Sequence, residues 1–504
     1  MSDVSSYRQI LRSSSITGGA AFINVLVSLL RTKAAAVLLG PAGVGLLGLF
    51  QNVMESAAIV SALGLGNAGA RQIAEAEGRG DATGVAAARR ALAIGTTVLA
   101  VVGAALVWLL RDPIAERVLG DSDRSREIGW LAVGVGLLVA SASQGGLLIG
   151  LRRVGDLARL SVWSSILGTI FGVASLWVLG EKGLLIFLLA MPLSTYLVGQ
   201  ILVRRLPVKK ANEPSLAILV VNWQALLRLG LAFMVVGLAV TMGQLAVRSM
   251  VQNQLGLDAL GYFQAAWAVS MTYVGFVLAA MSSDYFPRLT ATIRDHVAAN
   301  RLVNQQTEVA LLIAGPIFLT MLVFTPHVIA MLYSKAFDDS VTILRWQILG
   351  DILKLAGWPM GFIILAAGDG RTFVMSESLG ISVFVLLVWL GLPQIGLQAT
   401  GLAFIGMYLV YLPFVYWLAW RRTRFVWSLS VWVKFVCLLL AALLICILQR
   451  HSEVVAVACG TGAALCFALY SLARLSHMSN LGGIIGEIAK VSSAAIERIS
   501  ILRR

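Results

Sequence analysis

Apolar segments long enough to cross a membrane fill most of this chain and restrict its fold more than any other feature. A spanning helix needs about 20 apolar residues, and 59% of the 504 residues are hydrophobic while 13% are charged. The segments lack strand-like alternation, and lipid offers no partner to unpaired backbone groups, so helices are expected. The sequence predicts an all-α polytopic membrane protein with fourteen spans, at approximately 14–40, 43–70, 86–110, 128–150, 158–180, 183–203, 223–249, 259–285, 305–333, 341–367, 371–391, 396–420, 431–449 and 453–474.

Basic residues in the loops predict the orientation of these spans. If the N-terminus lies inside, the inside segments hold most of the Lys and Arg residues, including the runs at 152–153, 204–210 and 421–424. The positive-inside rule then places both termini in the cytoplasm. The first span is too long for a signal-peptide core and is expected to be retained. The formal charge of +14 follows from this topology, so we expect no nucleic-acid binding.

Residues for metal, redox or ATP chemistry are scattered along the sequence. The four cysteines fall in the last two spans without a CxxC motif, the four histidines lie near segment ends, and there is no Walker A stretch. We therefore expect no metal site, no cofactor and no enzymatic activity. A membrane glycan polymerase or ligase, the alternative from the enzyme class, would need a large outside loop, and the largest outside connection covers only residues 111–127.

Two stretches of the sequence occur twice, in the same order and at similar spacing. LGxFQ lies at 47–51 and again at 260–264, and the segment 146–160 resembles 361–375. Six spans separate the copies, so both have the same membrane orientation, as in transporters built from parallel repeats. We expect two six-helix lobes related by a parallel repeat. The expected parts are 1–203 for spans 1–6, 204–222 for a cytoplasmic linker, 223–424 for spans 7–12, 425–478 for spans 13–14 and 479–504 for an amphipathic tail.

Charged residues within the spans are the functional candidates. In RWQILGDILK (345–354), Gln347, Asp351 and Lys354 share one helix face, and Arg345 lies about 120° away from Asp351. Each charge costs about 2.5–3.5 kcal/mol at the centre of a bilayer. That cost is tolerable where the face borders water, so we expect these residues to line a wet cleft.

Polar faces on other spans extend this prediction to a cationic cavity. Cations outnumber acids among these residues, and a cleft with low-dielectric walls focuses their positive field, which favours an anionic substrate. The guanidinium group of Arg also matches the geometry of a phosphate. Structural alternatives stay open for Lys33, which could snorkel to the interface, for Arg248, which could be interfacial, and for Trp267, which could pack in the core. The predicted anion-binding residues are Arg31, Lys33, Arg248, Arg345 and Lys354, and the predicted polar or sugar-binding residues are Asn24, Gln51, Gln244, Gln264 and Trp267.

Two acidic residues are candidates for coupling transport to an ion gradient. A carboxylate inside a membrane cavity can take up and release a proton. Glu55, one helical turn after Gln51, is the first candidate, because Asp351 has Lys354 beside it. A purely structural pair between Asp351 and Lys354 is the alternative for that residue.

Four motifs suggest a family: LGPAGVGLLGLFQ after RTK, SDYFPRL (283–289), RWQILGDILK (345–354) and LAWRRTR (418–424). They resemble the Wzx-type translocases of lipid-linked oligosaccharides, and most closely the enterobacterial-common-antigen (lipid III) flippase group. That group belongs to the multidrug/oligosaccharidyl-lipid/polysaccharide (MOP) flippase superfamily. The likeness covers about residues 10–424, and Lys33, Asp351 and Lys354 lie in the matching motifs.

The resemblance implies a function for the whole chain. An antigen repeat unit on undecaprenyl pyrophosphate would move from the cytoplasmic to the periplasmic leaflet of the bacterial inner membrane. Alternating access would be coupled to a proton or ion gradient rather than to ATP. The implied partners are that lipid-linked oligosaccharide, membrane lipids, and the glycan polymerase and chain-length machinery.

The C-terminal part departs from this group, whose members commonly have twelve spans. Spans 13 and 14 show no polar stripe, and the segment 484–504 has Ile at helical spacing with Lys and Arg, which favours a helix on the membrane surface over a partner-binding helix. Peptidoglycan lipid II flippases of the superfamily have fourteen spans and are one alternative function. A multidrug cation antiporter is another, and it predicts an acid-dominated cavity.

Overall fold

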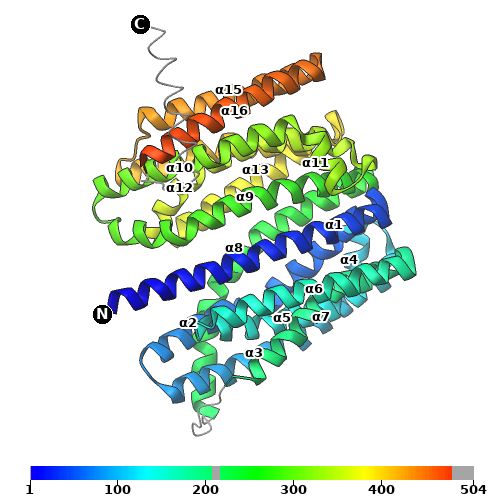
Figure 1. Ribbon diagram of the computed structural model, residues 1–504. Helices are drawn as coiled ribbons and strands as arrows, with labels where there is room; N and C mark the ends of the chain where they lie inside the picture. The colour runs from blue at the N-terminus through cyan, green and yellow to red at the C-terminus, as the bar shows by residue number, and fades with distance from the viewer. Residues whose placement is uncertain (1, 207–215, 479–504) are drawn as a thin grey trace. The chain divides into compact units, whose positions relative to one another are not determined.

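The computed structural model describes residues 2–206 and 216–478, which fold into helices joined by short turns (Figure 1). The predicted amphipathic tail and most of the predicted linker lie outside these residues. The first elements are α1 (Ser2–Ala62), α2 (Leu65–Gly78), α3 (Ala82–Leu109), α4 (Arg111–Ile114), η1 (Ala115–Leu119), η2 (Ser122–Arg124), α5 (Ser125–Gly150), α6 (Val154–Leu179), η3 (Gly180–Gly183), α7 (Leu184–Arg204) and α8 (Leu216–Leu255). The remaining elements are α9 (Leu257–Thr292), α10 (His296–Val323), α11 (Thr325–Leu332), η4 (Lys335–Phe337), α12 (Asp339–Ala366), α13 (Gly370–Ile395), α14 (Gln398–Thr423), α15 (Leu429–His451) and α16 (Glu453–Met478).

The predicted all-α polytopic fold is confirmed. Ten stretches of the described residues are long and apolar enough to cross a membrane. Two of them, Gly19–Ala62 and Val154–Arg204, each contain two predicted spans, and α8 and α9 correspond to predicted spans 7 and 8. The predicted boundary between spans 1 and 2 lies within α1, where two helices meet at a kink at Gly40 (φ 66°). Pro41 follows and lacks a backbone N–H, so it suits the first turn of the second of these helices. Predicted span 2 extends too far, because a break at Leu63 and Gly64 separates α1 from α2.

The chain packs as two compact units. The first contains residues 1–261 together with 332–336, and the second contains 262–331 together with the residues from Phe337 on. Helix α8 belongs to the first unit, where it packs against α1, α2 and α3. The expected lobe boundaries at 203 and 223 describe the internal repeat and stay a prediction.

The structure contains several features that recur at the spacing of the sequence repeat. Helix α7 packs against α5 and α6, and α14 packs in the same way against α12 and α13. Gly180 after α6 (φ 59°, ψ −136°) matches Gly396 after α13 (φ 58°, ψ −143°), 216 residues later. Asp81 caps α3 and Asp295 caps α10 by accepting backbone N–H groups through their side chains. Both halves therefore begin and end equivalent helices in equivalent ways, which supports the parallel repeat.

Gly45, two residues before the first LGxFQ copy, and Gly261, within the second copy, bring α1 and α9 into direct contact within the first unit. A Cβ on Gly45 would lie 2.6 Å from the carbonyl oxygen of Leu257 and 2.7 Å from the amide nitrogen of Gly261. A Cβ on Gly261 would overlap the carbonyl oxygen of Pro41. Small residues allow such close backbone approach between membrane helices. The glycine of the second LGxFQ copy is therefore a packing residue in the structure.

Replacing Gly261 by alanine tests this crossing. We expect Gly261→Ala to destabilise the protein by about 1–3 kcal/mol, because its Cβ meets backbone that cannot rotate away. Gly275→Ala on the same helix is the matched control, since a Cβ there has no neighbour within 4 Å. Thermal unfolding of the purified protein in detergent measures both, and equal melting temperatures for the two variants would contradict the close crossing.

The last two spans carry buried polar groups, so the expectation that they lack a polar stripe was wrong. Lys434 of α15 and Glu308 of α10 are both buried, and Lys434 Nζ lies 2.9 Å from Glu308 Oε1. Arg474 of α16 approaches the same oxygen at 3.5 Å, and Ser430 donates a hydrogen bond to it at 3.1 Å. The three ionic side chains come from three helices. They tie α15 and α16 to α10 at one carboxylate.

Removing one charge of the Lys434–Glu308 pair should lower the stability of the protein more than removing both charges. We expect Lys434→Met to destabilise the protein by about 3 kcal/mol, because Glu308 loses its closest cation while it stays buried. The double variant Glu308→Gln/Lys434→Met removes both charges and should melt at a higher temperature than the single Lys434 variant. Thermal melts of the single and double variants measure the difference, and a double variant that is the less stable of the two would refute a charge-pairing role.

Candidate functional site

The carboxylate of Asp351 lies at the centre of a polar cluster in the second unit. It is fully buried, and its Oδ2 accepts hydrogen bonds from the hydroxyls of Ser270 (2.7 Å) and Tyr273 (2.6 Å) on α9. Its Oδ1 is also buried but has no hydrogen-bond partner among the described residues. Buried polar atoms are normally paired, and a missing partner at a buried carboxylate is therefore a functional signal.

Lys354 lies one turn further along α12 and faces two carboxylates. Its Nζ contacts the sulfur of Met271 at 3.5 Å, and it interacts electrostatically with Asp351 and with Glu377 of α13. Glu377 Oε1 in turn accepts a hydrogen bond of 2.5 Å from the hydroxyl of Tyr411 on α14. No carboxylate oxygen of the described residues lies within ion-pair distance of Lys354, so its charge is balanced at longer range.

Gln347 completes the polar face of α12 that the sequence predicted. It is fully buried, and neither its amide nitrogen nor its amide oxygen has a hydrogen-bond partner among the described residues. The predicted shared face of Gln347, Asp351 and Lys354 exists. The expectation that the whole face lines a wet cleft was wrong for this conformation, because Gln347 and Asp351 are enclosed by packed helices and only Lys354 keeps some exposure.

Three of the predicted cations lie in the first unit and bind oxygen atoms. Arg31 donates a hydrogen bond of 3.0 Å to the carbonyl oxygen of Phe187, whose ring lies 4.5 Å below the guanidinium carbon. Lys33 donates to the carbonyl oxygen of Tyr333. This contact favours a position within the protein over the snorkelling alternative.

Arg248 and Glu55 belong to a second polar group of the first unit. Arg248 is buried and donates a hydrogen bond of 3.3 Å to the side-chain oxygen of Gln244, one turn earlier on α8. Glu55 interacts electrostatically with Arg248 and accepts a hydrogen bond of 2.9 Å from Gln51. The burial of Arg248 argues against the interfacial alternative.

Arg345 is separated from the Asp351 cluster, although both lie on α12. Its electrostatic partners are Cys446 of α15 and Glu453 of α16, and its Nε is buried without a hydrogen-bond partner. The 120° between Arg345 and Asp351 turns this side chain toward the two C-terminal helices. The five predicted anion-binding residues therefore form no single group within either unit.

The predicted sugar-contacting residues have mixed surroundings. Trp267 is buried and stacks on Phe384, with ring centroids 5.7 Å apart, and packs edge-on against Phe404. This arrangement favours the core-packing alternative for Trp267. Asn24 donates a hydrogen bond of 2.5 Å to the hydroxyl of Ser161 on α6, and Gln264 is partly exposed.

Several polar residues of these clusters were not among the sequence candidates for a site. Ser270 meets Asp351, Glu377 interacts with Lys354, and Tyr411 meets Glu377 only through tertiary packing. A weak signal was available, since Ser270 and Tyr273 lie at i, i+3 on one helix face within an apolar segment.

Loss of one hydroxyl donor should weaken the Asp351 cluster. We expect Tyr273→Phe to lower stability by about 1.5–3 kcal/mol, the usual worth of a hydrogen bond to a charged group. Tyr416→Phe is the control, because that tyrosine also packs against aromatic rings but its hydroxyl makes no hydrogen bond among the described residues. Thermal unfolding measures both variants. Similar small shifts in melting temperature for the two variants would show that the hydrogen bond from Tyr273 to Asp351 contributes nothing to stability.

The sequence matches one characterised family. The family described as polysaccharide biosynthesis protein matches residues 10–293. The lipid III flippase of Escherichia coli (strain K12) is 24% identical over 430 residues, which cover 82% of this chain and 99% of that protein.

Solved structures of transporters share the fold. An inward-facing multidrug resistance MATE family transporter of the MOP superfamily aligns with a TM-score of 0.65 at 18% identity, covering 80% of this chain and 94% of that one. The lipid II flippase MurJ in an inward closed conformation aligns with a TM-score of 0.65 at 13% identity, covering 92% of this chain and 99% of that one. These likenesses show that the chain shares the fold of these transporters.

Proposed function

Because this chain belongs to the polysaccharide biosynthesis protein family, we propose that it is a flippase for an oligosaccharide carried on a polyprenyl pyrophosphate. The observation that carries this proposal is the likeness to a lipid III flippase along 99% of that protein's length. The proposed direction is from the cytoplasmic to the periplasmic leaflet of the bacterial inner membrane, with both termini in the cytoplasm. Glycan polymerase and chain-length machinery stay predicted partners.

Cations within the spans suit the diphosphate of such a substrate. A pyrophosphate crossing a membrane needs positive groups that replace its hydration, and Arg and Lys supply charge-assisted hydrogen bonds. Arg31 and Lys354 are the strongest candidates, because neither forms a direct ion pair among the described residues. The proposed pyrophosphate-binding residues remain Arg31, Lys33, Arg248, Arg345 and Lys354.

Polar side chains in the same spans are proposed to contact the sugars. Asn24, Gln51, Gln244 and Gln264 keep this proposed role. Trp267 is the weakest member of the predicted set, because its ring faces are covered by other aromatic side chains.

Asp351 replaces Glu55 as the first candidate for ion coupling. A proton on Oδ1 would leave both hydroxyl hydrogen bonds to Oδ2 intact, since Oδ1 has no other partner. Protonation would also remove the negative charge that faces Lys354, so the ammonium group would bind an anionic substrate more strongly. Loss of the proton would reverse this effect, so the protonation state of Asp351 would set how strongly Lys354 attracts the substrate. Glu55, which already accepts a hydrogen bond from Gln51, stays the second candidate.

Transport across liposome membranes tests the proposal. Purified protein would be reconstituted with a polyprenyl-pyrophosphate oligosaccharide, and the rate at which the glycan reaches the opposite leaflet would be measured with and without a pH gradient. We expect Lys354→Ala to slow crossing by about tenfold or more, since one charge-assisted contact is worth about 1.5–3 kcal/mol. We expect Asp351→Asn to abolish stimulation by the gradient while gradient-independent crossing persists.

Controls separate this function from the alternatives. Lys182→Ala, in the exposed η3 turn, should transport at the wild-type rate. Lipid II in place of the oligosaccharide substrate tests the lipid II alternative, since the chain shares its fold with the solved lipid II flippase. Faster crossing of lipid II than of the oligosaccharide, or export of cationic dyes alone, would overturn the proposed substrate.

A further inference from the structure

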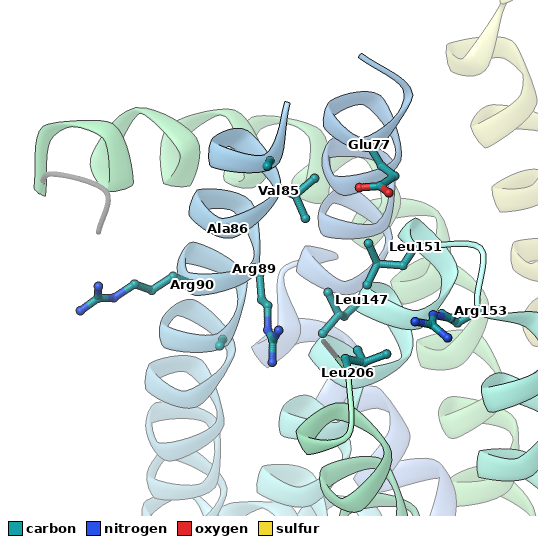
Figure 2. A pocket seen from close by; sticks show the side chains of 11 residues that line it. Glu77, Val85, Ala86, Arg89, Arg90, Leu147, Leu151, Arg153 and Leu206 are labelled. Atoms are coloured by element: carbon teal, nitrogen blue, oxygen red, sulfur yellow. The ribbon is translucent and has the colours of Figure 1, made fainter. Parts of the chain in front are cut away.

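A cavity of about 460 Å³ opens in the first unit, away from all the residues proposed for transport (Figure 2). It is bordered by the end of α2, the first three turns of α3, the end of α5 and Leu206, which lies two residues after the end of α7. The residues that line it are Glu77, Ala82, Val85, Ala86, Arg89, Arg90, Ala93, Leu147, Leu151, Arg153 and Leu206.

The cavity lies at the level of the predicted cytoplasmic surface of the membrane. The turn from α2 to α3, the turn from α5 to α6 and the end of α7 all lie on the side to which the positive-inside rule assigns the cytoplasm. Basic residues surround these three chain segments, including Arg79, Arg152, Arg204 and Arg205. A ligand at this level would meet both lipid headgroups and the first part of the acyl chains.

The lining combines a cationic side with an apolar side. Three arginines and one glutamate accompany seven alanine, valine and leucine residues. Figure 2 shows Arg89 and Arg153 on opposite sides of Leu147 and Leu206, whereas Arg90 extends away from them. A ligand that fits this lining carries negative charge at one end and hydrocarbon at the other.

Arg89 is the residue that most clearly lacks an anion. It is half-buried and makes no hydrogen bond or ion pair with the described residues. Arg153 lies 4.0 Å from Asp156, which is held more closely by Arg159 at 3.1 Å. A partly desolvated guanidinium without a counter-ion is unfavourable. Both arginines are therefore available to a bound phosphate.

We propose that this cavity binds an anionic phospholipid of the cytoplasmic leaflet. The phosphate lies between Arg89 and Arg153, and the glycerol and the first acyl-chain segment pack on Val85, Leu147 and Leu206. Basic pockets between membrane helices on the cytoplasmic side are suited to such headgroups. The lipid joins the start of α3, the end of α5 and the segment after α7, and this binding does not depend on the proposed transport function.

The lining distinguishes this ligand from two related ones. A lipid-linked oligosaccharide would place sugars beside the phosphate, and no lining residue is aromatic or carries a neutral hydrogen-bonding side chain. A free phosphate ion would leave the seven apolar residues without a partner. An anionic phospholipid uses both the charged and the apolar side of the cavity.

Lipid binding to the purified full-length protein tests the proposal. Native mass spectrometry of the delipidated protein would be titrated with phosphatidylglycerol or with phosphatidylcholine. We expect preferential binding of phosphatidylglycerol, weakened about fivefold by Arg89→Gln, since each basic residue near a lipid surface contributes about 1 kcal/mol. Arg89→Gln/Arg153→Gln should weaken binding further, and Ala86→Phe should weaken it by filling the cavity while the arginines remain.

The matched control is Arg71→Gln on α2, because Arg71 is exposed, pairs with Glu75 and does not line the cavity. This variant should bind phosphatidylglycerol like the wild type. Equal binding of phosphatidylglycerol by the wild type and the double arginine variant would overturn the proposal, as would equal binding of phosphatidylcholine. Displacement of the lipid by inorganic phosphate alone would assign a small-anion site instead. Displacement by the polyprenyl-pyrophosphate oligosaccharide would assign a substrate entry site.

Discussion

The lack of water in the lipid core is the constraint on which the rest of this structure depends. Every backbone polar group within a span must be paired inside the protein, and helices satisfy this locally. Even at Gly40 the chain changes direction inside α1 without a loop. The same constraint applies to side chains, so each charged group in a span needs a partner from a neighbouring helix or a functional reason to lack one.

The buried charges of this protein meet that requirement in two different ways. Lys434, Glu308 and Arg474 pair directly, and their role is to hold the last two helices against α10. Asp351 and Lys354 are paired only in part, because one carboxylate oxygen has no partner and the ammonium group contacts a sulfur atom. Direct pairing favours a fixed structure, whereas partial pairing leaves a site whose charge can change. The second arrangement is the one that a coupled transporter needs.

Helical phase decided which candidates could act together. Gln347, Asp351 and Lys354 share a face of α12, and the structure keeps them in one cluster with Ser270 and Tyr273. Arg345 is only two residues from Gln347 but faces α15 and α16. The cations of the first unit are held by carbonyl and amide oxygens of their own unit. The sequence predicted these residue types and their helices correctly, but their grouping into one cavity stays a prediction.

The sequence by itself determined the helical class, the approximate position of the spans and the internal repeat. Hydrophobic length and the recurring LGxFQ motif are properties of the local chain, so they can be seen without a structure. Only the tertiary structure decided the partners of the polar groups. Asp351 and Ser270 are 81 residues apart, and Lys434 meets Glu308 from a span that was expected to lack a polar stripe. The cavity beside Arg89 likewise needs three helix ends from different parts of the chain. The physical reason is that one helix fixes which residues share a face, whereas the packing of several helices decides what that face meets.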